Sequence, residues 1–109
     1  MRRGEVWWAE LLPPVGRRPV VLLSRNAAYR VRTLVTVGIV TRTIRAIPVE
    51  VSLGPEDGMP EQCVVNLDDI FTIPKTRLAE RIATLSPQKM TAVAKAIIFA
   101  LDLKVYELT

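Results

Sequence analysis

The chain has 109 residues, with 15 Lys or Arg, 11 Asp or Glu, a formal net charge of +4, one Cys and no His. The absence of His excludes a Ser-His-Asp triad, His-pair ribonuclease chemistry and a zinc site built on His. The single Cys excludes an internal disulfide and a Cys-rich zinc cluster, so any catalysis must come from Arg, Lys, Thr, Ser, Tyr or carboxylates.

The first predicted strand covers residues 4–12, GEVWWAELL. Period-two alternation puts Val6 and Trp8 on one face of this strand, with Trp7 and Ala9 on the other. The pattern therefore predicts that at least one of the two Trp side chains enters the core, while the other could stack on a base.

Two more strands follow a loop rich in Pro and Gly at 13–16. Residues 18–24, RPVVLLS, form an apolar run that is typical of a strand buried on both faces. Residues 33–41, TLVTVGIVT, are rich in β-branched side chains, and Gly38 within them indicates a bulge or a close approach of the backbone.

The second half of the chain predicts further short strands. Residues 47–53, IPVEVSL, alternate polar and apolar side chains and should have one wet face. The segment GPEDGMPEQ at 54–62 is the clearest loop in the sequence. The remaining elements expected before the helix are the strands CVVNL at 63–67, DIFTI at 69–73 and RIATL at 81–85, with a turn at 74–77.

One helix is predicted, at the C-terminal end. Ser86 is a good N-cap residue, and Pro87 suits the first helical position. Residues at helical spacing form one apolar stripe that should pack on the sheet: Met90, Val93, Ala94, Ile97, Ile98 and Leu101. Six or seven short strands with this helix predict a mostly β chain with a C-terminal helix (α+β), folded as a small, partly closed antiparallel barrel.

We expect one domain over residues 1–109, because the length supports a single core and half of the residues are apolar. No apolar run approaches the roughly 18 residues of a membrane span. The N-terminus also lacks the continuous apolar region of a signal peptide. These features predict a soluble, cytoplasmic protein without a membrane segment.

The charge is distributed unevenly along the chain. Residues 1–54 contain nine basic residues, all Arg, and three acidic residues, whereas residues 55–109 contain six basic and eight acidic residues. The first half therefore carries a net charge of +6 and the second half −2. An all-Arg surface is either an ordinary solvated face or a binding surface for an acidic partner, because guanidinium groups pair with phosphate and stack on bases.

Few residues could hold a metal or a cofactor. The five Gly residues are scattered and form no phosphate-binding loop. Asp68 and Asp69 are adjacent and should point to opposite faces of a strand, so they cannot chelate well together. Cys63 lies in an apolar run and is predicted to be a small buried side chain rather than a nucleophile. We therefore expect no metal site and no cofactor.

One group of Arg and hydroxyl residues remains after this elimination. Arg17 and Arg18 lie where a loop enters a buried strand, and Thr41, Arg42 and Thr43 lie where another strand ends, followed by Arg45. From composition alone these residues are either strand-end surface residues or an anion-binding group.

Several sequence blocks in a fixed order help to decide between these two interpretations. They are RRGEVWWAEL at 2–11, PPVG at 13–16, RPVVLLSRN at 18–26, VGIVTRTIRAIPVEVSL at 37–53, VVNLDDIFTI at 64–73, KTRL at 75–78 and the closing helix with its Leu-Asp-Leu end at 101–103. Through these blocks the chain resembles the MazF/PemK family of toxin endoribonucleases from bacterial type II toxin–antitoxin systems.

The resemblance implies an SH3-like β-barrel of the PemK/CcdB type. It also implies a toxin endoribonuclease, or mRNA interferase, that cuts single-stranded RNA (mRNA, rRNA or tRNA) at specific sequences. The implied reaction is a metal-independent transesterification through a 2′,3′-cyclic phosphate. The family's two catalytic residues fall on Arg18 and Thr41. We expect further RNA contacts from Arg17, Asn26, Arg42, Thr43, Arg45 and Asp69.

The sequence departs from the family pattern in three places. The family usually has a longer segment before the strand that begins at Arg18, so the site should be more open here. A Gln-Ile-Arg run that is frequent in the family is replaced by Asp69-Ile70-Phe71, and an Asp beside an RNA path repels phosphate unless it accepts a hydrogen bond from a base. Residues 104–109 extend past the family pattern. The recognised RNA sequence therefore cannot be carried over.

The resemblance also implies two protein partners, a second copy of the chain in a homodimer and an antitoxin. The antitoxin would be MazE-like, with an acidic, disordered tail that covers the active surface. Two alternatives stay open. A CcdB-like gyrase poison shares the fold but depends on a C-terminal Trp-Gly-Ile, whereas this chain ends KVYELT. A non-catalytic nucleic-acid-binding β-barrel would need only the Arg surface.

Overall fold

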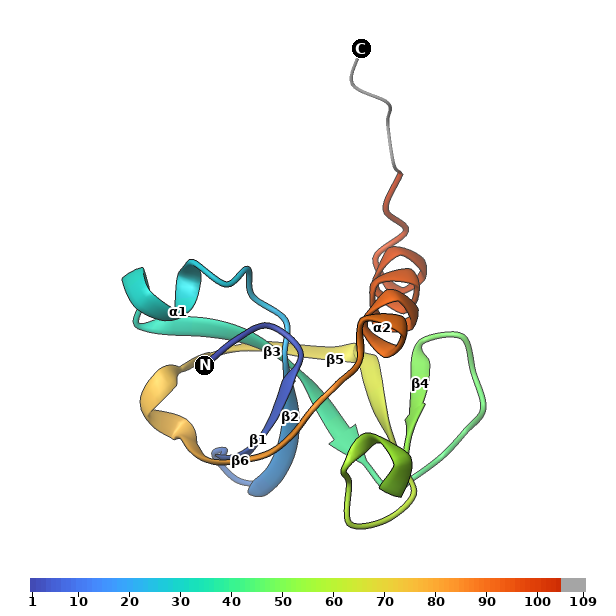
Figure 1. The fold of residues 1–109 in the computed structure, drawn as a ribbon, viewed down its shortest axis with the longest axis horizontal. Helices are drawn as coiled ribbons and strands as arrows, with labels where there is room; N and C mark the ends of the chain where they lie inside the picture. The colour runs from blue at the N-terminus through green and yellow to red at the C-terminus, as the bar shows by residue number, and fades with distance from the viewer. Residues whose placement is uncertain (105–109) are drawn as a thin grey trace.

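A computed structural model describes residues 1–104, which form one six-stranded sheet and a C-terminal helix (Figure 1). The strands are β1 (Glu5–Glu10), β2 (Arg17–Leu22), β3 (Leu34–Thr41), β4 (Glu50–Leu53), β5 (Cys63–Pro74) and β6 (Leu78–Thr84). The helices are α1 (Ala28–Val31) and α2 (Pro87–Ala100), with 3-10 turns at Pro55–Asp57 and Lys75–Arg77. This architecture confirms the predicted mostly β fold with a C-terminal helix. Of the predicted C-terminal extension, residues 105–109 lie outside the described residues.

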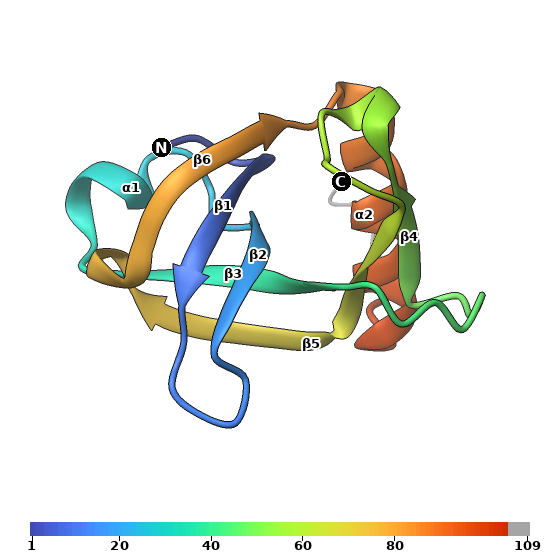
Figure 2. The same ribbon diagram turned by 90° about the horizontal axis from the view of Figure 1, so that it is seen from below.

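The sheet is a curled half-barrel in which every neighbouring pair of strands is antiparallel. Its strand order is β4-β5-β3-β2-β1-β6, so β4 and β6 are the two edges. In Figure 2, β3 and β5 run side by side across the width of the molecule, and the loop between β1 and β2 projects beyond the sheet. The prediction of a partly closed antiparallel barrel is confirmed.

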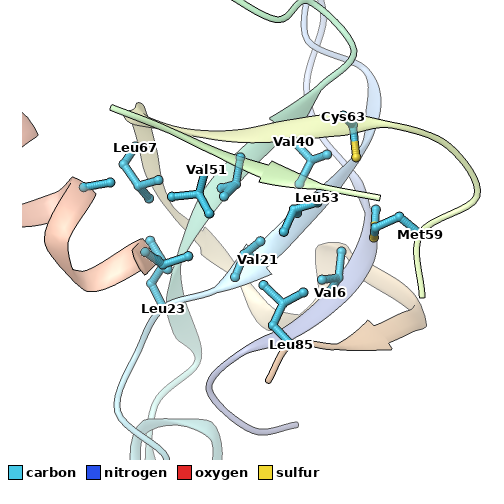
Figure 3. Close-up of a cluster of buried hydrophobic side chains, with 13 residues drawn as sticks. Val6, Val21, Leu23, Val40, Val51, Leu53, Met59, Cys63, Leu67 and Leu85 are labelled. Carbon is cyan, nitrogen blue, oxygen red and sulfur yellow. The ribbon is translucent and has the colours of Figure 1, made fainter. Parts of the chain in front are cut away.

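Two apolar clusters lie on opposite faces of the central strands. The helix-side cluster, drawn in Figure 3, is Val6, Val21, Leu23, Val40, Val51, Leu53, Met59, Cys63, Val65, Leu67, Leu85, Val93 and Ala96. The Tyr29-side cluster is Ala9, Val20, Leu22, Tyr29, Val35, Val37, Ile39, Ile73 and Leu78. Because successive side chains of a strand alternate, β2 supplies Val21 to the first cluster and its two neighbours to the second. This confirms that β2 is buried on both faces.

A bulge in β5 explains why one long strand reads as two short ones in the sequence. Gly38 of β3 pairs with Ile70, whereas the next residue, Ile39, pairs with Asn66, so residues 67–69 have no partner on β3. Because the number of extra residues is odd, the side-chain alternation on one side of the bulge is reversed on the other side. The segments 63–67 and 69–73, which were expected to be two strands, are parts of one continuous strand. Gly38 lies opposite this bulge, and a Cβ there would lie 3.1 Å from Val65 Cγ2. The prediction for Gly38 is confirmed.

Helix α2 begins as the sequence predicts, with the Ser86 hydroxyl accepting a hydrogen bond from the Lys89 N–H at 3.1 Å. The predicted stripe is partly wrong. Val93 is buried, but Ile98 and Leu101 are exposed, and Ala96 is buried in their place. The face of α2 that packs on the sheet is therefore centred on Val93 and Ala96. None of the helices in residues 1–104 is long and apolar enough to span a membrane.

The short helix α1 is absent from the sequence-based expectation. It spans one turn, and no side chain caps its N-terminus, so it lacks the signals by which a helix is found. It is held by tertiary contacts instead, since the buried Tyr29 hydroxyl donates to the Ser24 carbonyl at 3.0 Å. Burial raises the pKa of Tyr29 to about 12.

Candidate active site

Two neighbouring pockets meet at the start of β2 and the end of β3. The larger, of about 510 Å³, is called here the Trp8 pocket, and the smaller, of about 340 Å³, the Asn66 pocket. Arg18, Thr41 and Val15 line both pockets. The register that pairs Val20 with Ile39 brings Arg18 level with Thr41 just beyond the last paired residues of the two strands. Antiparallel pairing thus joins two residues that are 23 positions apart.

The Trp8 pocket has a mixed aromatic and charged lining. Arg17 lies over the Trp8 ring, with its Cζ 4.9 Å from the ring centroid, and forms an ion pair with Glu10. A cation–π contact therefore holds an Arg and an indole together in the lining of this pocket. The complete lining is Trp8, Val15, Arg17, Arg18, Pro19, Val40, Thr41, Arg42, Met59, Pro60, Glu61 and Cys63.

The loop between β4 and β5 forms one wall of the Trp8 pocket. Glu61 of this loop lies 3.6 Å from Arg42, oxygen to nitrogen, and both side chains are largely exposed. Cys63 and Met59 lie together at one end of the helix-side cluster (Figure 3). Burial raises the pKa of the Cys63 thiol, and the nearby carboxylates of Glu61 and Asp57 raise it further. The thiol is therefore neutral at pH 7, as expected for a small buried residue.

The Asn66 pocket has polar groups of both kinds beside an exposed ring. Its lining residues are Pro14, Val15, Arg18, Ile39, Thr41, Thr43, Arg45, Asn66, Asp69 and Phe71. Asn66 is only 5% exposed, and its Oδ1 accepts a hydrogen bond from the Asp68 N–H at 2.9 Å. Phe71 is 45% exposed. The β5 bulge is what brings Asp69 to the same pocket as Asn66.

Hydrogen bonds hold the two residues that lie between the pockets. Arg18 Nε donates to the Val15 carbonyl at 3.3 Å, which ties the guanidinium to the β1–β2 loop. Thr41 Oγ1 accepts from the Thr43 N–H at 3.2 Å, so the hydroxyl proton remains available to a ligand. Both side chains are partly exposed. An anion bound between the pockets would therefore meet a fixed cation and a hydroxyl donor.

The structure gathers most of the predicted site residues. Arg17, Arg18, Thr41, Arg42, Thr43, Arg45 and Asp69 all line one or both pockets. Asn26 lines neither pocket; its Oδ1 accepts from the Arg3 N–H at 2.7 Å. Arg45 is held through its backbone, since its N–H donates to Glu50 Oε1 at 2.9 Å.

The lining residues that were not predicted to take part in the site include Asn66, Phe71, Val15 and Glu61. Asn66 could have been recognised as a candidate site residue from the sequence, because it is a polar residue near the end of the apolar run CVVNL. The other three had no such signal. The positions of Val15 and Glu61 depend on how loops fold over the strand ends, and the position of Phe71 depends on the bulge in β5. Within residues 1–104, no group of three His, Cys, Asp or Glu side chains could hold a metal ion.

The fold and the site define a small, curled antiparallel β-barrel protein with an Arg-rich surface that contains two adjoining pockets. Residues 2–101 match the family model described as "PemK-like, MazF-like toxin of type II toxin-antitoxin system", and the chain belongs to this family.

Similar proteins agree in sequence and in fold. A protein of Mycobacterium tuberculosis named "Probable endoribonuclease MazF5" is 41% identical over 101 residues, covering 92% of each chain. The "Mycobacterium tuberculosis toxin MazF-mt6" structure has a TM-score of 0.86 at 33% identity, covering 93% of this chain and 99% of that one. A mycobacterial "Endoribonuclease in complex with its cognate antitoxin" also has a TM-score of 0.86, at 31% identity, covering 97% and 99%.

Proposed function

We propose that this chain is a toxin endoribonuclease that cleaves single-stranded RNA at specific sequences, without a metal ion, and is neutralised by an antitoxin. The observation that carries the proposal is the position of Arg18 and Thr41 between two pockets. A scissile phosphate at that point would have one flanking nucleotide in each pocket. The names of the relatives as endoribonucleases support the reaction class and do not favour a gyrase poison or a non-catalytic barrel.

The proposed reaction is a transesterification within the RNA. The ribose 2′-oxygen attacks the adjacent phosphorus, the bond from phosphorus to the 5′-oxygen breaks, and the products are a 2′,3′-cyclic phosphate and a 5′-hydroxyl. DNA lacks the 2′-OH and cannot react this way. The 2′-OH proton passes to water and the leaving 5′-oxygen takes a proton from water, because the site has no imidazole to act as base or acid. A modest rate follows.

Arg18 is proposed to stabilise the transition state. Negative charge grows on the non-bridging phosphate oxygens during attack, and a guanidinium already held by the Val15 carbonyl binds that charge without reorganising. A guanidinium holds its protons too firmly to act as a general acid at neutral pH. Thr41 would donate its hydroxyl proton to the phosphate and help to orient it. A hydroxyl is too weakly basic to take the 2′-OH proton alone.

The Arg residues around this point support an RNA-binding and antitoxin-binding role. Arg17, Arg42 and Arg45 line the pockets and are exposed, so they could contact neighbouring phosphates. The same positive surface would attract an acidic antitoxin tail. The structure of a relative in complex with its cognate antitoxin supports such a partner for this chain.

A homodimer is part of the proposal. Helix α2 and the residues after it expose Ile98, Phe99, Leu101 and Leu103, which are 38–60% accessible. Exposed apolar side chains that lie close together at the end of α2 and just after it favour burial against another protein surface.

The first test is RNA cleavage in excess EDTA. We expect the wild-type chain to cut a defined single-stranded RNA under these conditions and to leave 2′,3′-cyclic phosphate ends or the 3′-phosphates formed from them. Arg18→Ala should lower the rate by roughly 10²–10³-fold, because it removes the charge that stabilises the transition state. Gel electrophoresis and mass spectrometry of the products measure both results.

The matched control is Arg30→Ala, since Arg30 is exposed on α1 and lines neither pocket. It should cut like the wild type. Loss of cleavage in EDTA would contradict the metal-independent mechanism. Full activity in a folded Arg18→Ala variant would contradict the role of Arg18.

A further inference from the structure

We propose that the Asn66 pocket selects a base with an exocyclic amino group (guanine, cytosine or adenine) at one of the two positions that flank the cut, and that Asp69 is the residue that rejects uracil. This inference rests on the proposed ribonuclease function and deepens it. It concerns one of the two pockets that meet at Arg18.

The position of the pocket makes it a subsite for a nucleotide next to the cleaved bond. Arg18 and Thr41 line this pocket and the Trp8 pocket alike. A phosphate held between these two residues joins two nucleosides, and one of them must lie on the side of Asn66. The pocket of about 340 Å³ is large enough for a single base.

Asn66 supplies a donor of fixed orientation. Its Oδ1 already accepts the Asp68 N–H, so the Nδ2 amino group remains to donate to a ligand. The residue is 5% exposed, which means that its side chain is held by its surroundings and cannot turn away freely. A base acceptor, such as a ring nitrogen or a carbonyl oxygen, would satisfy this donor.

Asp69 supplies a hydrogen-bond acceptor. Its carboxylate has no ion pair or side-chain hydrogen bond to any residue within 1–104. A carboxylate at pH 7 can only accept hydrogen bonds, and it repels phosphate. Its useful partner in an RNA site is therefore an N–H group of a base. The bulge of β5 brings this carboxylate to the pocket, and bulges commonly aim a side chain at an active site.

Phe71 completes the pocket with an apolar surface. Its side chain is 45% exposed on the strand that follows the bulge. An exposed aromatic ring beside base-edge hydrogen-bonding groups is suited to stack on a base of any identity. Stacking would contribute affinity for any base, and hydrogen bonds to Asn66 and Asp69 would provide the specificity.

The four bases differ in what they offer to this pair of groups. Adenine and cytosine have an amino group next to a ring-nitrogen acceptor on the pairing edge. Guanine has two adjacent donors, its amino group and N1–H, followed by the O6 acceptor. Each of these bases can therefore donate to Asp69 and accept from Asn66 together. Uracil has carbonyl oxygens on both sides of a single N–H. When that N–H donates to Asp69 and one carbonyl accepts from Asn66, the other carbonyl lies beside the carboxylate. Two acceptors facing each other in a partly enclosed site repel, which disfavours uracil.

The test compares cut sites of the wild type with those of Asp69→Asn. A long single-stranded RNA that contains every trinucleotide is digested in EDTA, and the ends are sequenced. We expect uracil to be depleted about tenfold or more at one flanking position in the wild-type cuts. Asp69→Asn adds a donor without changing size, and it should allow uracil at that position. Asp69→Ala should relax the preference among all four bases.

The matched control is Asp68→Asn, which changes the neighbouring exposed carboxylate that lines neither pocket and keeps the N–H bonded to Asn66. It should cut like the wild type. Equal use of uracil by the wild type and by both Asp69 variants would overturn the inference while leaving the ribonuclease function intact. The same change of preference in Asp68→Asn would also overturn it. No RNA cleavage by the folded wild type would overturn the proposed function and this inference with it.

Discussion

A buried carboxylate near the N-terminus shows how single residues set the stability of this half-barrel. Glu5 is 5% exposed, and it accepts hydrogen bonds from Trp7 Nε1 at 2.9 Å and from Arg81 Nη1 at 3.4 Å. Burial alone would raise its pKa. The hydrogen bonds from Trp7, Arg2 and Arg81, with the positive N-terminus, outweigh burial and hold the pKa below the ordinary value of 4.5. The folded state therefore prefers the ionised form.

This preference predicts how stability depends on pH. Because the folded pKa of Glu5 is depressed, its contribution is fully present above pH 4.5 and is lost as the pH falls through the folded pKa. Glu5→Gln should lower the free energy of unfolding at pH 7 by about 1–2 kcal/mol. It should also flatten the decline of stability below pH 4.5. Urea denaturation between pH 3 and pH 7 measures both effects.

Glu80→Gln is the control, because Glu80 is an exposed residue of β6 with no ion pair among residues 1–104. It should leave the pH profile unchanged. A Glu5→Gln variant with the wild-type pH profile would show that Glu5 has an ordinary pKa in the folded state.

At the residue scale, the sequence predicts the charged part of the candidate site better than the rest. Arg18 and Thr41 could be placed together because each lies at the end of a recognisable apolar strand and the strands pair in register. Asn26 follows the same strand as Arg18 but at its other end, on the far side from the pockets. Phe71 could not be assigned, because its role depends on the bulge that precedes it.

At the scale of elements, β5 is the part that sequence patterns describe least well. Period-two alternation holds up to Asn66 and again from Ile70, but with opposite faces, since three residues intervene. Each half alone looks like a complete strand. The other strands and α2 could be located because their patterns are unbroken, but β4 begins at Glu50 and β6 at Leu78, whereas the predicted strands begin at residues 47 and 81.

The close approach at the bulge predicts the effect of a single methyl group. In Gly38→Ala the new Cβ would lie 3.1 Å from Val65 Cγ2 and 3.3 Å from Leu67 Cδ1. Both neighbours are fully buried and have little room to move. We expect a loss of about 1–3 kcal/mol in the free energy of unfolding, measured by urea denaturation. Ser52→Ala, on the exposed face of β4, should change stability far less. Equal stability of the two variants would mean that β3 and β5 can separate at the bulge without cost.

At the scale of the whole molecule, one group of exposed apolar side chains lies at the end of α2 and in the residues that follow it. Phe99 is 60% exposed, and Leu101 is 56% exposed. If the proposed homodimer buries this group, Phe99→Glu should bring a charge into the interface and produce a monomer. Light scattering coupled to gel filtration, at tens of micromolar protein, measures the change.

Val31→Glu is the matched control, because Val31 is 71% exposed but lies on α1, at the other end of the molecule (Figure 1). This variant should remain a dimer. A monomeric wild type, or a dimeric Phe99→Glu variant, would contradict a dimer built on the end of α2.

The two apolar clusters on opposite faces of β1, β2 and β3 have a consequence for how the molecule comes apart. Both clusters contain residues of β1, β2 and β3, so opening one removes support from the other. Such coupling makes unfolding a single cooperative transition rather than a sequence of local losses. Arg18 and Thr41 extend from two of the shared strands. The catalytic geometry proposed here is therefore as durable as the fold itself: it persists until global unfolding and returns only when the whole sheet has re-formed.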